Sequence, residues 1–115
     1  MSPGGASVEG VVLCTAAGHR FAVLAREVTT VEPPDDAAPW AGRGFEPGAP
    51  RPDGGRLLRH EELGLLVDAL EVHGEAVPVL PVPALLSGAG LRGFVEAAGH
   101  LWPVVSLRAL VARLG

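Results

Sequence analysis

The 115-residue sequence contains no isoleucine, lysine, asparagine, glutamine or tyrosine, and its aromatic residues are three phenylalanines and two tryptophans. The lack of tyrosine excludes a phenolic group as a catalytic acid. The single cysteine, Cys14, excludes an intramolecular disulfide and a cysteine-rich zinc site. No apolar run approaches the roughly 20 residues that cross a bilayer, so we expect no transmembrane helix and no direct insertion into a membrane.

Charged residues are few and predominantly acidic. Nine arginines stand against thirteen aspartates and glutamates, which gives a net charge of −4 at pH 7 and a pI near 5.5. Binding to nucleic-acid phosphates requires a basic stripe, so nucleic acid is not expected as the main partner. Residues 1–6 lack a basic flank and an apolar core, which argues against a secretory signal. We therefore expect a single cytoplasmic domain.

Glycine and proline are abundant, with 16 and 11 copies. The segment 33–55 alone holds six prolines and five glycines, and its large apolar residues are Trp40 and Phe45. Each proline removes a hydrogen-bond donor from a sheet ladder, so this segment cannot contain a central strand. We expect a long loop that Trp40 anchors to the body of the domain.

Short apolar segments separated by turn residues predict a mainly β fold. Ser106 is a good N-cap for a C-terminal amphipathic helix. The pattern predicts one long strand over 63–72, with Asp68 near its middle and Gly74 closing it. The remaining expectations are a disordered tail at 1–7, a hairpin at 8–15 and 20–24, short strands at 29–32 and 57–60, an extended segment at 77–83, a turn at 84–86, a loop at 87–90, a second hairpin at 91–97 and 101–105, and the helix at 107–114.

Motifs that would support enzymatic chemistry are incomplete. The four histidines share no metal-ligand spacing, and the segment 60–64 (HEELG) lacks the second histidine of a zinc-protease helix. The segment 88–93 matches G-x-G-x-x-G but lacks the strand, helix and acidic residue of a dinucleotide site. Cys14 lies in an apolar run, so we expect a buried thiol rather than a nucleophile. The sequence therefore predicts a protein without enzymatic activity, cofactor or metal.

Two features have open interpretations. Asp68 is either a hydrogen-bonded structural carboxylate or a contact at a partner surface. The segment 77–83 (VPVLPVP) is either an edge strand or a polyproline ligand for an aromatic groove. Many apolar strands without a catalytic set favour a scaffold that binds proteins through edges and grooves. A small ligand-binding or enzymatic β-barrel is the alternative.

The segment Leu63–Val72 (LGLLVDALEV) resembles the central strand of CheW, the coupling protein of bacterial chemosensory arrays, in which the pattern is G-[IL]-x-V-D-x-V-x-x-V. The flanking segments follow in the family's order. Val8–Glu32 resembles its opening hairpin, Pro81–Leu86 its proline-bearing crossover, and Leu91–Leu114 its closing hairpin and helix. The ordered combination covers most of the chain.

The resemblance implies a fold of two small SH3-like β-barrels packed together, with a short C-terminal helix. A chemoreceptor helical hairpin would bind in the groove between the barrels, and the histidine kinase CheA would bind elsewhere. Segment 33–55 stands where the family has an R-G-x-x-x-P-x-x-D-L-like strand pair, so we expect a truncated first barrel. The domain at 8–115 would then divide into a first subdomain at 8–32, the loop at 33–55, and a second subdomain with the helix at 56–115.

The resemblance also implies an adaptor function and an interface. Two residues, Val28 and Val31, would lie near the receptor groove on the first barrel, and four from the second would line or support it: Leu65, Val67, Asp68 and Leu70. The missing strands supply much of the kinase contact in the family, so CheA binding is expected to be weakened or lost. The edge that they leave would suit pairing with a second copy or with another CheW-like protein. An adaptor for a different regulator stays an alternative.

Overall fold

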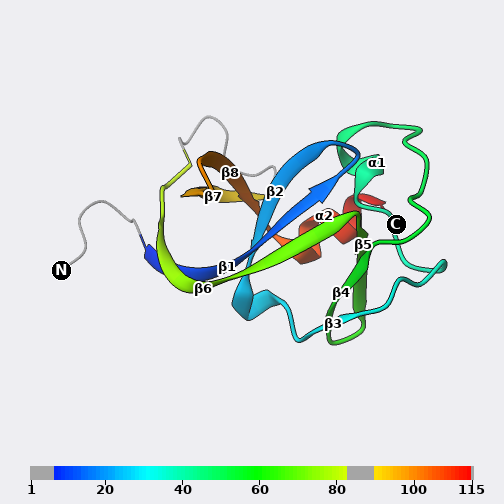
Figure 1. The fold of residues 1–115 in the computed structure, drawn as a ribbon, viewed down its shortest axis with the longest axis horizontal. Helices are drawn as coiled ribbons and strands as arrows, with labels where there is room; N and C mark the ends of the chain where they lie inside the picture. The colour runs from blue at the N-terminus through cyan, green and yellow to red at the C-terminus, as the bar shows by residue number, and fades with distance from the viewer. Residues whose placement is uncertain (1–6, 83–89, 115) are drawn as a thin grey trace.

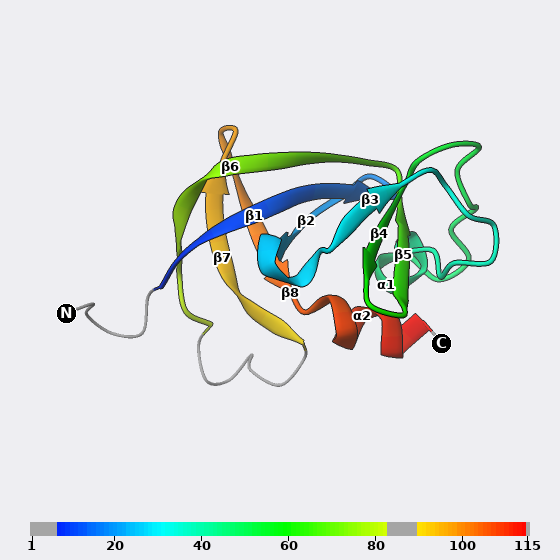
Figure 2. The same ribbon diagram turned by 90° about the horizontal axis from the view of Figure 1, so that it is seen from below.

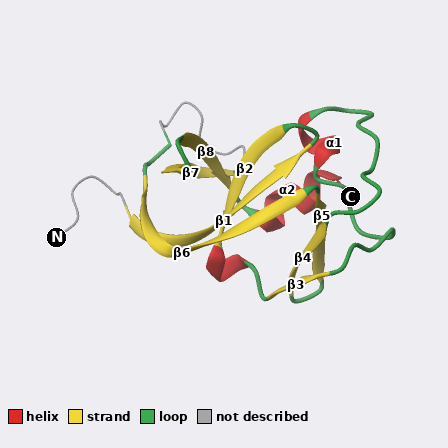
Figure 3. Ribbon diagram, in the orientation of Figure 1, coloured by secondary structure: helices red, strands yellow, loops and turns green. Residues whose placement is uncertain are grey.

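The computed structural model describes residues 7–82 and 90–114, and it arranges them as two β-sheets and short helices (Figures 1 and 3). One sheet has five strands in the order β6-β1-β2-β8-β7, and the other has three in the order β3-β4-β5. The elements are β1 (Ser7–Ala16), β2 (His19–Leu24), the 3-10 helix η1 (Ala25–Glu27), β3 (Thr30–Glu32), α1 (Gly42–Phe45), β4 (Arg56–His60), β5 (Leu63–Val67), β6 (Ala69–Val79), β7 (Leu91–Ala97), β8 (His100–Val105) and α2 (Leu107–Leu114). The predicted mainly β fold with a short C-terminal helix is confirmed.

Both predicted hairpins are present. β1 and β2 pair in antiparallel register around a two-residue turn, in which Ala17 and Gly18 have φ of 53° and 80°. β7 and β8 form the second hairpin, and β8 joins the first through a parallel contact between Ala22 and Val104. Of the predicted tail, Ser7 begins β1 and the rest lies outside the described residues. The turn and loop predicted at 84–90 also lie outside them, except for Gly90.

Alternate residues of β1 and β2 enter two different cores. The inter-sheet core fills the space between the two sheets and the helices, and the half-barrel core lies inside the curved five-stranded sheet. The inter-sheet core consists of Val12, Cys14, Ala16, Phe21, Val23, Ala38, Trp40, Ala41, Leu57, Leu58, Leu65, Leu66, Val67, Leu107 and Leu110. The half-barrel core consists of Val11, Leu13, Ala22, Leu24, Val79, Val95, Ala97, Trp102 and Val104. Burial on both faces explains why these two strands carry continuous apolar runs.

The predicted single strand at 63–72 is wrong. The chain bends at Asp68, so that β5 ends at Val67 and pairs with β4, while β6 begins at Ala69 and pairs with β1 in the other sheet. Figure 1 shows β6 running from this bend alongside β1, as the edge strand of the five-stranded sheet. The apolar run is a crossover between two sheets, because each half finds a different partner strand.

β6 also continues past the point where Gly74 was expected to close it. It extends through Pro78, which lies opposite Val8 of β1. Proline is tolerated here because β6 is the last strand of its sheet, so the missing N–H group can fall on the unpaired side. Beyond the strand, Leu80 forms a bridge with Phe94 of β7.

Segment 33–55 contains the short helix α1 and no strand. Trp40 is buried and forms an isolated bridge with Leu66 of β5. Two backbone hydrogen bonds complete the contact, since Ala41 donates to the Leu66 carbonyl at 2.9 Å and Leu66 donates to the Pro39 carbonyl at 2.8 Å. The expected anchoring role of Trp40 is confirmed.

The sheets do not follow the expected division of the chain at 33–55. The five-stranded sheet takes β1 and β2 from the predicted first subdomain and β6, β7 and β8 from the second. The three-stranded sheet likewise joins β3 to β4 and β5. β1 pairs with β2 on one edge and with β6 on the other, and β6 comes from residues far along the chain.

The terminal helix α2 has the predicted N-cap, because the Ser106 hydroxyl accepts a hydrogen bond from the Ala109 amide at 3.2 Å. The Glu27 carboxylate adds a second cap. It accepts from the Leu107 amide at 3.2 Å and pairs with Arg92 at 3.0 Å. α2 therefore ties η1 to β7, and Figure 2 shows it on the side of the molecule away from β6. Neither α2 nor any other described helix has the length and apolar character needed to cross a membrane.

Candidate protein-interaction surface

The six residues predicted for the interface occupy three environments. Leu65 and Val67 are fully buried in the inter-sheet core, so neither can contact a partner. Val28 and Leu70 are half-buried and pack against the same core. Only Val31, which is 41% exposed, and Asp68 are open to solvent. Leu65 and Val67 can therefore only support such a surface from beneath.

Asp68 holds the crossover between the sheets. Its backbone N–H donates to the Thr15 carbonyl at 2.9 Å, and its Oδ2 atom accepts from the Ala17 amide at 2.9 Å. Both bonds join the bend to the end of the β1–β2 hairpin. Of the two interpretations left open by the sequence, this geometry matches the hydrogen-bonded structural carboxylate.

The sequence-based selection missed Val72, which is 60% exposed on β6. Val72 lies opposite Val12, and Val31 lies opposite Leu58. Directly opposed residues of an antiparallel pair share a face, and Val12 and Leu58 both belong to the inter-sheet core. Val72 and Val31 therefore lie at exposed margins of one core, on the terminal strands of two sheets.

We name these apolar residues the β3–β6 surface, and its members are Val28, Val31, Leu70 and Val72. Leu70 and Val72 alternate on one face of β6, and a predicted strand that began at Ala69 would have included Val72 in the interface. A single predicted strand from Leu63 to Val72 gives no reason to expect that its first half is buried and its last residue is exposed.

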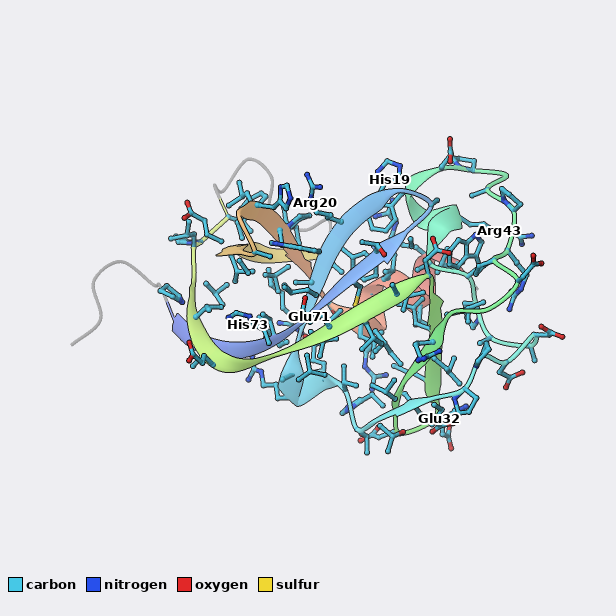
Figure 4. All side chains as sticks on the ribbon, in the orientation of Figure 1. His19, Arg20, Glu32, Arg43, Glu71 and His73 are labelled. Atoms are coloured by element: carbon cyan, nitrogen blue, oxygen red, sulfur yellow. The ribbon has the colours of Figure 1, made fainter. Side chains whose placement is uncertain are left out.

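A polar cluster includes the two neighbours of Val31 on β3, Thr30 and Glu32. The Glu32 carboxylate accepts a hydrogen bond from the Thr30 hydroxyl at 2.8 Å and pairs with Arg59 Nε at 3.0 Å. The Thr30 hydrogen bond, followed by that of Arg59, lowers the pKa of Glu32 below its ordinary value. Figure 4 shows Glu32 at the margin of the three-stranded sheet. Because Thr30 and Glu32 alternate with Val31 along β3, this cluster lies on the opposite face of the three-stranded sheet from Val31.

The nucleophile and metal chemistry of the described residues is limited. Cys14 is fully buried, and desolvation raises the pKa of its thiol to about 12, so it stays protonated at neutral pH. Within ranges 7–82 and 90–114, no three His, Cys, Asp or Glu side chains come together as a metal site. An open depression of about 240 Å³ is lined by residues that include Leu13, Glu71 and Trp102.

Comparison with known proteins bears on the fold. No protein-family model and no curated protein sequence matches the chain. Among solved structures, the scaffolding protein TtCheW from Thermoanaerobacter tengcongensis aligns with a TM-score of 0.60, over 86% of this chain and 89% of that one, at 14% identity. The chain has a CheW-like fold.

Within this CheW-like fold, the segment that resembles the central CheW strand has a definite place. LGLLVDALEV provides β5, the bend at Asp68 and the start of β6, so it joins the two sheets. Of the two exposed valines, Val72 is the last residue of this segment, and Val31 lies on β3, at the other edge of the sheet that contains β5.

Proposed function

We propose that the chain is a noncatalytic, cytoplasmic CheW-like adaptor of bacterial chemotaxis-type signalling. Its partner would be the helical cytoplasmic tip of a chemoreceptor, bound along the β3–β6 surface. The CheW-like fold supports this proposal, since the solved structure that it resembles is a scaffolding protein. An amphipathic helix can lay its apolar face against such a surface.

The observation that carries the proposal is the pair Val31 and Val72. Single exposed apolar residues are ordinary on protein surfaces. These two, however, are 41% and 60% exposed at opposite margins of the same core, where β3 and β6 end their sheets. Leu70 and Val28 lie half-buried against that core and extend the apolar surface.

We further propose that kinase binding is weakened or lost. Segment 33–55 holds one short helix in place of the strand pair that supplies much of the CheA contact in the family. The chain would then act as a shortened form of the family, similar to FrzB of the Frz chemosensory system. It would modulate array assembly or coupling through the receptor and other CheW-like proteins.

Binding of a purified receptor cytoplasmic fragment to the chain tests the proposal. Val31→Glu places a charge in the apolar surface and should weaken binding at least about tenfold, because a charge at an interface core is costly. Leu101→Glu is the matched control, since Leu101 is 52% exposed on β8 and lies outside the surface. Circular dichroism establishes that both variants fold.

Two results would refute the proposal. One is a folded wild-type chain that fails to bind any receptor fragment, and the other is Val31→Glu binding as tightly as Leu101→Glu. A CheA fragment is measured separately, and it should bind more weakly than the receptor. Val67→Asp is unsuitable as a test because Val67 is fully buried.

A further inference from the structure

The outer edge of β6 is an unpaired strand edge. β6 ends its sheet, and among the described elements it pairs with β1 alone over Ala69–Val79. Such an edge presents free N–H and C=O groups and is a template for another strand. Natural proteins commonly protect an edge with lysine, which this chain lacks entirely.

The register shows which backbone groups face outward. Because the β1–β2 hairpin closes through a two-residue turn, the backbone groups of Ala16 face β2 and those of Thr15 face β6. The hydrogen bond from Asp68 to the Thr15 carbonyl agrees with this. Glu71 lies opposite Leu13 and His73 lies opposite Val11. By alternation along the strands, the backbone N–H and C=O groups of Glu71 and His73 point toward β1.

Leu70 and Val72 alternate with these two residues and therefore have their N–H and C=O groups on the free side. Both lie at the start of β6, where its pairing with β1 is regular. The regular part ends after His73, because the register with β1 shifts between Glu9 and Val11. An added strand would thus bind the first half of β6.

We propose that two copies of this chain associate by pairing their β6 edges in antiparallel register centred on Val72. In this register Val72 meets Val72 of the second copy, and Leu70 meets Gly74. The Glu71 carboxylate then lies opposite the His73 imidazole, twice by symmetry. Opposed side chains of an antiparallel pair are close enough to interact, so the carboxylate can accept a hydrogen bond from the imidazole.

Charge selects this register over its neighbours. Centring on Glu71 would set two Glu71 carboxylates face to face, and centring on His73 would set Glu71 against Glu75. Like charges directly opposite are destabilising. A register centred on Gly74 would place most of its pairs in the irregular stretch between His73 and Val77, whereas the register centred on Val72 reaches only Gly74, the first residue of that stretch. Figure 4 shows Glu71 and His73 on successive parts of β6.

Pairing through β6 involves Leu70 and Val72, which also belong to the β3–β6 surface, but the two proposals can be tested separately. Pairing uses the backbone of β6, whereas the receptor variant Val31→Glu changes β3 in the other sheet. Val31→Glu should leave the dimer intact even where it abolishes receptor binding. Absence of the dimer would therefore not contradict the proposed adaptor function. Absence of receptor binding would likewise not contradict the proposed dimer.

A charge-swap series measured by sedimentation velocity tests the pairing. Wild-type chain should dimerise, and His73→Glu should weaken the dimer about tenfold, because it sets two carboxylates opposite each other at two places. The double variant Glu71→His with His73→Glu restores Glu–His pairs without a like-charge pair only in the register centred on Val72, and it should restore the dimer. A monomeric wild type, an unaffected His73→Glu, or a failed rescue would overturn the proposal.

Cross-linking through an introduced cysteine tests the register directly. Paired residues of an antiparallel ladder have Cα atoms about 5.5 Å apart, within the range that a disulfide spans. Val72→Cys should form a covalent dimer on mild oxidation, while Leu101→Cys, which introduces a similarly exposed thiol on β8, should not. Native Cys14 is fully buried and does not compete. Equal cross-linking of the two variants would contradict the proposed register.

Discussion

β5 and β6 come from one apolar segment yet have opposite environments. In β5, Leu65 and Val67 are completely buried, whereas in β6, Leu70 is half-buried and Val72 is 60% exposed. β5 pairs with β4 and is covered by Trp40 and α2, while β6 ends its sheet. Leucine and valine occur in both strands, but β6 also carries Glu71, His73 and Glu75, and β5 has no charged residue or histidine.

The difference shows how one bend gives the two halves of the segment different environments. Because Asp68 turns the chain, β5 joins the core between the sheets and β6 joins an edge. The buried half then contributes to stability, and the exposed half is free for binding. Three predictions test this comparison and a fourth tests the edge strand β3, from the largest expected effect to the smallest.

A charge should be intolerable in β5 and harmless in β6. Val67→Asp buries an unpaired carboxylate in the inter-sheet core and should lower the free energy of unfolding by more than about 3 kcal/mol. Val72→Asp, at an exposed position, should change it by less than about 0.5 kcal/mol. Urea denaturation in dilute solution measures both, and equal losses would contradict the comparison.

Glycine-to-alanine substitutions should also have different effects on stability next to β5 and within β6. Gly55 has φ of +107°, and a Cβ atom there would meet the Val67 carbonyl of β5. Gly55→Ala should therefore destabilise the fold by about 2 kcal/mol. Gly74 of β6 has open space around its Cβ position, so Gly74→Ala should be neutral or stabilise by up to about 1 kcal/mol. Thermal unfolding measures the stability of both variants. If Gly74→Ala lost as much stability as Gly55→Ala, the space around Gly74 of β6 would not be open.

The bend itself should depend on the Asp68 side chain. Asp68→Ala removes the acceptor for the Ala17 amide and should cost about 1 kcal/mol. Asp68→Asn keeps an oxygen acceptor and should cost less. Denaturant titration of the two variants is the measurement. If Asp68→Ala matched wild type, the carboxylate would not hold the crossover.

The smallest effect concerns Glu32, on the edge strand of the other sheet. Its pKa is lowered in the folded chain, so its bonds to Thr30 and Arg59 stabilise the fold above the ordinary glutamate pKa. This contribution is lost as the pH falls through the lowered value. The stability advantage of wild type over Glu32→Gln should therefore shrink from neutral to acidic pH. A constant difference across that range would contradict the assignment.

Local patterns were reliable where the structure is local. The hairpins at β1–β2 and β7–β8 and the Ser106-capped helix were predicted because turn residues, alternation and helical spacing act within a few residues. The anchoring of segment 33–55 followed from Trp40, its large apolar residue. The strand at 63–72 was mispredicted because strand periodicity cannot show which partner strand each half will meet.

The residues predicted for the interface differ in exposure for the same reason. Val31 is exposed and can contact a partner, while Leu65 and Val67 are fully buried and can only support such a surface from beneath. The exposed Val72 was missed because a valine on an edge strand and a valine in a core have the same local pattern.

The sequence by itself determined the mainly β class, the positions of the hairpins, the terminal helix and the irregular segment 33–55. Short-range forces decide these features: turn conformations, capping and the removal of apolar side chains from water. Only the tertiary structure decided that Asp68 separates two sheets and that β6 ends one of them. That depends on β1 pairing with residues more than fifty positions away, which no local pattern records.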